Sequence, residues 1–218
     1  MTSNDPPAEA PILSHQVYAD ELRTHAVALI WMGFQRLNAT SLTQSEEDDI
    51  TGELVREMKC VIQDPSSPVW VDHYHVQEQI LKNINDKRGK RRPKMDIEFE
   101  RSGRGDRPIL GFEAKRLGRG NNVGTYLGKE GLTAFVNGYY STTHGEAGML
   151  GYVQERTPED WAAKLAKRLE NGVAEFRVTS DGGWKSIDHE VAFPASYTVH
   201  TDSRDQQLSI IHVLLAFT

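Results

Sequence analysis

The chain of 218 residues contains a single cysteine, Cys60. One thiol excludes an internal disulfide and a thiolate zinc cluster, which suits a reducing compartment. The sequence also lacks an apolar run long enough to cross a bilayer, and its start lacks the pattern of a signal peptide. Internal repeats are missing as well. These absences predict a cytoplasmic protein with no membrane segment.

A positive net charge is also lacking, because the formal charge is −6. This balance is unusual for a protein whose whole surface binds nucleic acid. The length suits one domain with a full hydrophobic core. We expect a disordered tail over residues 1–11, which hold three prolines among small polar residues, and a single domain over residues 12–218.

The charge that is present is unevenly distributed. Residues 82–94 carry seven basic side chains and one acid, Asp86. A basic loop of this kind favours phosphate backbones, since counterion release supplies affinity that is independent of sequence. The alternative is a solvated loop that only aids solubility. The residues predicted to bind nucleic acid are Lys87, Arg88, Lys90, Arg91, Arg92, Lys94, Arg116 and Arg119.

Acidic side chains accompany a predicted hairpin of strands at residues 95–100 and 109–115, joined by a turn rich in glycine. Residues two apart on a strand share a face, so Glu113 and Lys115 project together, and an antiparallel partner brings Asp96 beside them. Two carboxylates suit Mg²⁺, and an amine nearby suits phosphodiester hydrolysis. The alternative is a solvated strand face with an ordinary ion pair.

Helical and strand patterns surround this hairpin. The segment at 45–58 has Ser45 as a candidate N-cap, acids in its first turn and an apolar stripe through Ile50 and Leu54. We expect helices over 12–37, 45–58, 126–140 and 158–169, and further strands over 69–76, 148–153, 176–178, 195–200 and 208–217. The last strand is almost wholly apolar and is expected to be buried.

Asp96, a spacer and then Glu113-Ala114-Lys115 resemble the signature of the PD-(D/E)XK nuclease superfamily, although Met95 stands where that family name has proline. The predicted order of helix, hairpin, helix, strand and helix over about residues 45–170 is similar to the common core of that family. The resemblance implies an α/β (α+β) fold with a restriction-endonuclease-like core, in which helices flank a central mixed β-sheet.

The resemblance also implies a chemistry. Asp96, Glu113 and the carbonyl of Ala114 would hold one or two Mg²⁺ ions, with Mn²⁺ as a substitute, and Lys115 would orient or deprotonate the attacking water. A helix in this family often supplies another acid, for which Glu53 is preferred and Glu78 is the alternative.

The implied function is a Mg²⁺-dependent endonuclease that cuts DNA and acts in bacterial anti-phage defence or restriction, with DNA repair and mobile-element maintenance as equal alternatives. Duplex DNA, a second copy of the chain and a protein of a defence complex are the expected partners. Two alternatives stay open: a non-catalytic nucleic-acid-binding or assembly subunit of a larger complex, and an interaction module such as an inhibitor or adaptor.

Overall fold

A computed structural model describes residues 15–81, 93–102, 109–140, 142, 145–187 and 195–218, so the predicted tail at 1–11 lies outside the described residues. The protein has an α/β fold in which helices flank a seven-stranded mixed sheet. The elements are α1 (His15–Arg36), α2 (Glu47–Gln63), β1 (Tyr74–Leu81), β2 (Lys94–Arg101), β3 (Ile109–Leu117), α3 (Val123–Leu127), α4 (Leu132–Val136), β4 (Glu146–Val153), α5 (Pro158–Asn171), β5 (Lys185–Ser186), β6 (Ala195–Thr201) and β7 (Gln207–Ala216). None of the described helices combines the length and apolar character needed to cross a bilayer.

The strands follow the order β1-β2-β3-β4-β7-β6-β5 across the sheet. The β1–β2 and β2–β3 pairs are antiparallel, β4 is parallel to both β3 and β7, and β5 and β6 complete the sheet with antiparallel pairing. The C-terminal strand β7 therefore lies inside the sheet rather than at its edge. Its nearly continuous apolar sequence is buried, as expected for a strand covered on both faces.

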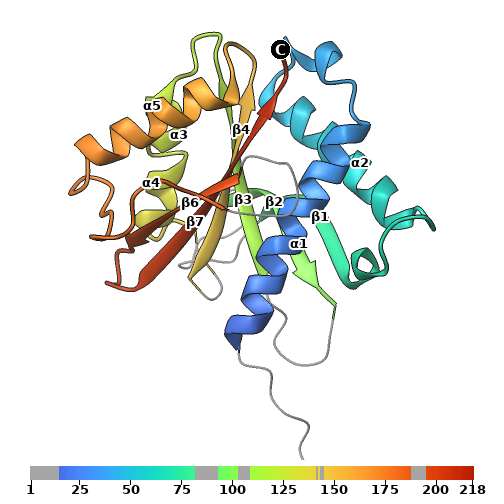
Figure 1. The fold of residues 1–218 in the computed structure, drawn as a ribbon, viewed down its shortest axis with the longest axis horizontal. Helices are drawn as coiled ribbons and strands as arrows, with labels where there is room; N and C mark the ends of the chain where they lie inside the picture. The colour runs from blue at the N-terminus through green and yellow to red at the C-terminus, as the bar shows by residue number, and fades with distance from the viewer. Residues whose placement is uncertain (1–14, 82–92, 103–108, 141, 143–144, 188–194) are drawn as a thin grey trace, which may run out of the picture.

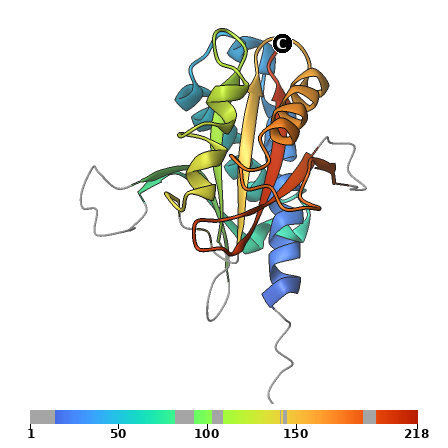
Figure 2. The ribbon, with the colours of Figure 1, turned by 90° about the vertical axis from the view of Figure 1, so that its left-hand side faces the viewer.

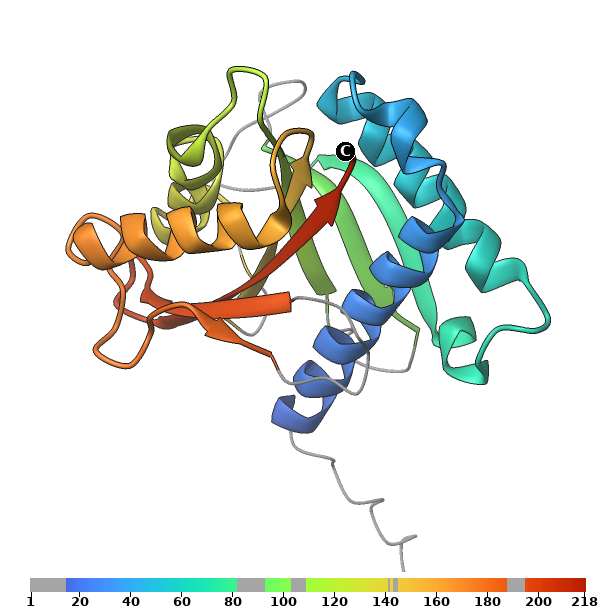
Figure 3. The ribbon, with the colours of Figure 1, turned by 45° about the horizontal axis from the view of Figure 1, so that its top comes forward.

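The helices form a layer on each side of the sheet (Figure 1). Helices α1 and α2 pack on one face with apolar residues of β1, β2 and β3, including Ile97, Phe99 and Phe112. Helices α3, α4 and α5 pack on the other face, as the rotated view in Figure 2 shows. In Figure 3, α1 runs obliquely across the strands that it covers.

The predicted helix over residues 126–140 is wrong, because the chain forms two short helices, α3 and α4, instead. Its apolar spacing continues through the break, which is why the pattern suggested one helix. The cause of the break is a close backbone approach at Gly131, where a side chain would overlap the carbonyl of Tyr126. Only glycine permits this contact, since it has no Cβ atom.

Three other local predictions are corrected. The first part of the expected strand at 69–76 is a 3₁₀ helix (Val69–His73), which begins after Pro68, whose carbonyl accepts a bond from the Val71 amide at 3.0 Å. Ser45 does not cap α2, because Glu46 occupies the N-cap position. The expected strand at 176–178 makes one isolated bridge, between Val178 and His200.

Candidate active site

Strands β2 and β3 separate at one end of the sheet. Their pairing ends at Ile97 and Phe112, although β3 continues to Leu117. Alternate residues of a strand direct their N–H and C=O groups to the same edge, so Ala114 and Arg116 both face the gap that β2 leaves. Side-chain carboxylates take the place of the missing strand there.

Two acids bind these free amides. Asp96 Oδ2 accepts a hydrogen bond from the Ala114 amide at 2.8 Å, and Glu47 Oε2 accepts one from the Arg116 amide at 3.1 Å. Asp96 belongs to β2, whereas Glu47 is the first residue of α2. The gap therefore gathers groups from two strands and one helix.

A distortion of the sheet accompanies Asp96. The register between β1 and β2 has no pair at this residue, and Gln79, in the opposite position of β1, has a φ of 56°. Met95 packs with the core under α3 to α5, whereas Ile97 packs with the core under α1 and α2. Strand β2 therefore turns about Asp96, and irregularities of this kind often re-aim side chains beside functional sites.

The ammonium of Lys115 lies within a set of three oxygen atoms. Its Nζ donates to Ala114 O at 2.7 Å, to Glu113 Oε1 at 2.8 Å and to Glu47 Oε1 at 3.0 Å. The side chains of Lys115 and Glu113 are 8% and 6% exposed, so this ion pair is nearly cut off from solvent. A buried charge of this kind is retained only where close partners compensate it.

Burial and neighbouring charges shift the ionisation of these groups. Burial, reinforced by the charge of Asp96, raises the pKa of Glu113 to about 8, despite the opposing effect of Lys115. Burial also raises the pKa of Asp96, and the hydrogen bond from Ala114 partly offsets it. Burial acts to lower the pKa of Lys115, but the charges of Glu113 and Glu47 outweigh it and raise that pKa. The lysine is therefore held as a cation.

The donor atoms fit a hard cation. They comprise carboxylate oxygens and one main-chain carbonyl oxygen, the groups that Mg²⁺ and Mn²⁺ prefer. Glu113 Oε2 is buried and no bond to it from the described residues meets normal hydrogen-bond geometry, although the Tyr140 hydroxyl lies near enough to Glu113 to act on its pKa. Within the same described part, no three histidine, cysteine, aspartate or glutamate side chains are already arranged around one metal position. The cation that these oxygens surround is Lys115 Nζ.

The helix-borne acid is Glu47, which the sequence analysis did not single out. The preferred candidate, Glu53, points away from the gap and pairs with Arg56 of the same helix, with 2.5 Å between Oε2 and Nη2. The alternative, Glu78, is exposed on β1 and has no contact with Lys115. Neither residue joins Asp96, Glu113 and Lys115.

A signal for Glu47 was present in the sequence. At about 100° per residue, Glu47 lies within about 20° of the centre of the stripe formed by Ile50, Leu54 and Met58, whereas Glu53 lies about 100° from that centre. Glu47 is also in the first turn, where an acid is favoured by the helix dipole. A helix that packs its stripe on the sheet therefore directs Glu47 toward the strands.

The predicted basic residues fall into two groups. Lys87, Arg88, Lys90, Arg91 and Arg92 lie outside the described residues. Among the others, Arg116 pairs with Glu46 at 2.6 Å and Arg119 Nη1 donates to Thr43 O at 3.4 Å, so both lie beside the start of α2. Lys94 begins β2, two residues before Asp96.

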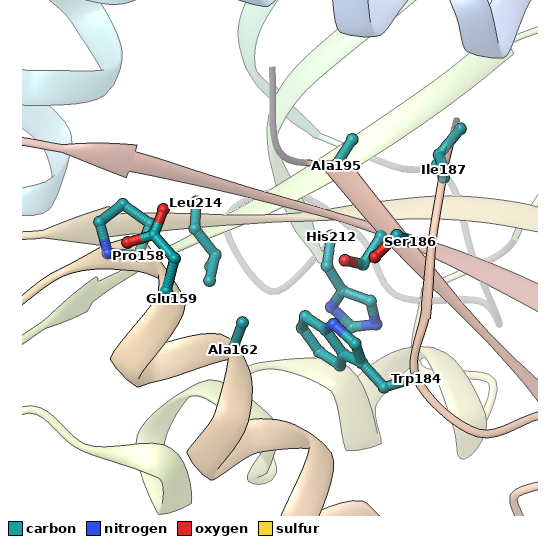
Figure 4. Close-up of a pocket in the computed structure, with 10 residues that line it drawn as sticks. Pro158, Glu159, Ala162, Trp184, Ser186, Ile187, Ala195, His212 and Leu214 are labelled. Carbon is teal, nitrogen blue, oxygen red and sulfur yellow. The ribbon is translucent and has the colours of Figure 1, made fainter. Parts of the chain in front are cut away.

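A cavity of about 280 Å³ lies elsewhere, between α5 and strands β5 to β7 (Figure 4). Trp184 and His212 stack there with their ring centroids 4.4 Å apart, and Glu159 of α5 lies at its side. None of Glu47, Asp96, Glu113 and Lys115 lines this cavity. The acids and the ammonium therefore form a separate site at the gap between β2 and β3.

Comparison with models of protein families, with curated proteins and with solved structures gives no match for this chain, so its functional interpretation rests on the geometry of the site.

Proposed function

We propose that this protein is a Mg²⁺-dependent nuclease, able to use Mn²⁺, that hydrolyses phosphodiester bonds in DNA. One observation carries the proposal: Lys115, Glu113, Glu47 and Asp96 converge where β2 and β3 separate, around the free backbone groups of Ala114 and Arg116. The side chains of Lys115 and Glu113 are buried, those of Glu47 and Asp96 are partly buried, and their charges compensate one another, unlike those of a solvated hairpin face.

The arrangement of elements supports the same proposal. Helix α2 precedes an antiparallel β1–β2–β3 unit, helices α3 and α4 follow, and β4 then lies parallel to β3. This order agrees with the core expected of the PD-(D/E)XK nucleases. A restriction-endonuclease-like core is therefore part of our proposal, and the fold alone would not define the activity.

Asp96, Glu113, Glu47 and the carbonyl of Ala114 would hold the cation. When bound, such a cation lowers the pKa of a coordinated water and offsets negative charge on the phosphate. Lys115 is buried and protonated, so its ammonium would donate to the attacking water or to a phosphate oxygen. The Ala114 amide holds Asp96 in place by donating to Oδ2, and the other carboxylate oxygen of Asp96 takes no part in that bond.

Arg116, Arg119 and Lys94 flank the site and would bind the phosphate backbone, together with the basic loop at residues 82–92. Contacts of this kind position a duplex without reading its sequence. Duplex DNA is therefore the proposed substrate. A homodimer, a defence partner and a role in anti-phage defence or restriction stay predictions from the resemblance.

The test is cleavage of plasmid DNA, linear duplex DNA, single-stranded DNA and RNA, each with Mg²⁺, with Mn²⁺ and with a chelator. We expect cleavage of duplex DNA that requires the metal, and a loss of at least about 100-fold in Asp96→Ala and Lys115→Ala. Cation-independent binding without cleavage would instead identify a binding subunit, and an inactive parent protein would refute the nuclease proposal.

Glu47→Ala and Glu53→Ala form a matched pair in the same helix. Removing Glu47 should lower the cleavage rate at least about tenfold, because both Lys115 and the Arg116 amide lose a charged acceptor. Removing Glu53 should leave the rate unchanged, since it contacts Arg56 only at the surface. Equal rates in the two variants would contradict the assignment of Glu47 to the site.

A further inference from the structure

The C-terminal end of β4 holds the first turn of α2. Tyr152 is fully buried, and its hydroxyl oxygen lies 2.9 Å from Thr51 Oγ1. Thr51 Oγ1 in turn lies 2.8 Å from the main-chain carbonyl of Glu47. Because that carbonyl only accepts, Thr51 donates its one hydroxyl proton to it, and Tyr152 donates to Thr51. The hydrogen bonds therefore run from β4 to Glu47.

These contacts close a ring around the proposed site. The carboxylate of Glu47 binds the Arg116 amide and Lys115, and Arg116 is the direct partner of Tyr152 in the β3–β4 pair. The contacts run from Tyr152 of β4 to Thr51 and Glu47 of α2. They then pass to Arg116 of β3, which pairs with Tyr152 and closes the ring. A ring of this kind fixes the distance between the helix and the strand.

The start of α2 has further restraints from β3 and β4, among them the pair of Arg116 with Glu46 at 2.6 Å. The N-cap residue Glu46 makes no capping hydrogen bond with its side chain, and the Glu47 side chain is 29% exposed. Gln154, two residues beyond Tyr152, donates from Nε2 to Ser45 O at 2.9 Å. The restraints on this turn therefore come from the ends of β3 and β4 together.

We propose that Tyr152 is a positioning residue that acts through Thr51 to hold the Glu47 carboxylate against β3, an inference that rests on the proposed function for its catalytic consequence. Without its hydroxyl, the first turn of α2 moves away from the gap. Lys115 and the Arg116 amide then lose their shared acceptor, although Asp96 and Glu113 stay in place.

Tyr152→Phe is a clean variant, because Thr51 keeps its bond to the Glu47 carbonyl and no buried donor is left unpaired. Tyr126→Phe is its matched control. Tyr126 is also fully buried, but its hydroxyl bonds to Met149 O and His212, which lie outside the proposed site. Both variants lose one buried tyrosine hydroxyl, and only Tyr152→Phe breaks the ring.

The first measurement is hydrogen exchange of the Arg116 amide by NMR, which needs neither metal nor activity. We expect exchange about fivefold faster in Tyr152→Phe and in Glu47→Ala, and unchanged in Tyr126→Phe. Thr51→Ser keeps the hydroxyl and should retain the protection, whereas Thr51→Val should lose it. Unchanged Arg116 exchange in Tyr152→Phe would overturn the inference, whatever the activity of the parent protein.

The second measurement is a double-mutant cycle of Tyr152→Phe with Glu47→Ala, read as kcat and KM for duplex cleavage and as calorimetric Mn²⁺ affinity. We expect Tyr152→Phe alone to lower kcat about fivefold and to have no further effect once Glu47 is removed. Additive losses would show that Tyr152 acts independently of Glu47. An inactive parent protein with fast Arg116 exchange in Tyr152→Phe would refute the nuclease proposal alone.

Discussion

At the scale of single residues, Lys115 is the group that decides how the site behaves without a metal. Its Nζ lies 2.7–3.0 Å from the oxygens of Ala114, Glu113 and Glu47, which are also the oxygens best suited to a divalent cation. These oxygens cannot bind the Lys115 ammonium and a divalent cation at the same time at these distances. Lys115 therefore competes with a metal for Glu113 and Glu47.

Replacing Lys115 with methionine should raise the affinity for Mn²⁺ at least about tenfold, because the variant removes a buried positive charge beside the carboxylates. The same variant should not cleave DNA. Isothermal titration calorimetry measures the affinity, and Lys164→Met on α5 is a control that should bind Mn²⁺ as the parent protein does. Unchanged or weaker binding in Lys115→Met would contradict the competition.

At the scale of elements, the parallel β3–β4 pair is the scaffold of the site. Gly148 of β4 is the register partner of Phe112, whose ring is fully buried. A Cβ atom at Gly148 would overlap the Phe112 ring, so this ring lies against the backbone of β4 only because Gly148 has no side chain. The next residue of β3 is Glu113, and the packing at Gly148 therefore bears on the position of the site.

Gly148→Ala should destabilise the protein by about 1–3 kcal/mol, since the added methyl group forces the Phe112 ring or β4 to move. Urea unfolding followed by circular dichroism measures the change in the free energy of unfolding. Gly183→Ala is the control, because a Cβ atom there meets no atom within 4 Å, and its effect should stay within about 0.5 kcal/mol. A neutral Gly148→Ala would show that the Phe112 ring can move aside without cost.

At the scale of the whole molecule, a buried chain of hydrogen bonds ties the C-terminal strands to α3. His200 Nδ1 lies 2.7 Å from Phe176 O, so it donates, and its Nε2 accepts from Thr198. Thr198 then accepts from His212 Nε2, and His212 Nδ1 lies 3.1 Å from the Tyr126 hydroxyl, which also lies 3.3 Å from Met149 O. Each imidazole is enclosed away from water, which disfavours its charged form. Burial accordingly lowers the pKa of both His200 and His212.

The two buried histidines of this hydrogen-bond series predict that the protein loses stability in mild acid. Below the ordinary histidine pKa of 6.5, the unfolded state binds protons that folded His200 and His212 do not bind, so the free energy of unfolding falls as the pH falls. The expected slope is up to about 1.4 kcal/mol per pH unit for each histidine. Urea unfolding at several pH values between about 6.5 and 5 measures it.

Glu113 contributes the opposite slope. Its pKa rises from 4.5 to about 8 on folding, so the folded state binds its proton more tightly and gains stability as the pH falls through that range. The parent protein should therefore show a shallower slope than Glu113→Gln over this pH range. Equal slopes in the two proteins would contradict the raised pKa of Glu113.

Much of the fold was predictable because local patterns agree with tertiary packing. The alternation at residues 95–100 and 109–115 indicated the antiparallel β2–β3 pair, and the apolar run at 208–217 indicated buried β7. The break between α3 and α4 was not predictable from apolar spacing. It depends on a backbone contact between Gly131 and Tyr126 that exists only in the folded chain.

The sequence by itself determined that Glu113 and Lys115 share one face, because the period of a strand is two residues. It also placed the acids in the first turn of α2. The apolar stripe of α2 directs Glu47 rather than Glu53 toward the sheet, but only the tertiary structure decided that Glu47 reaches Lys115. The reason is that the strands separate beyond Phe112 and leave amides that the nearest carboxylates must satisfy, a demand that arises only once helix and sheet have packed together.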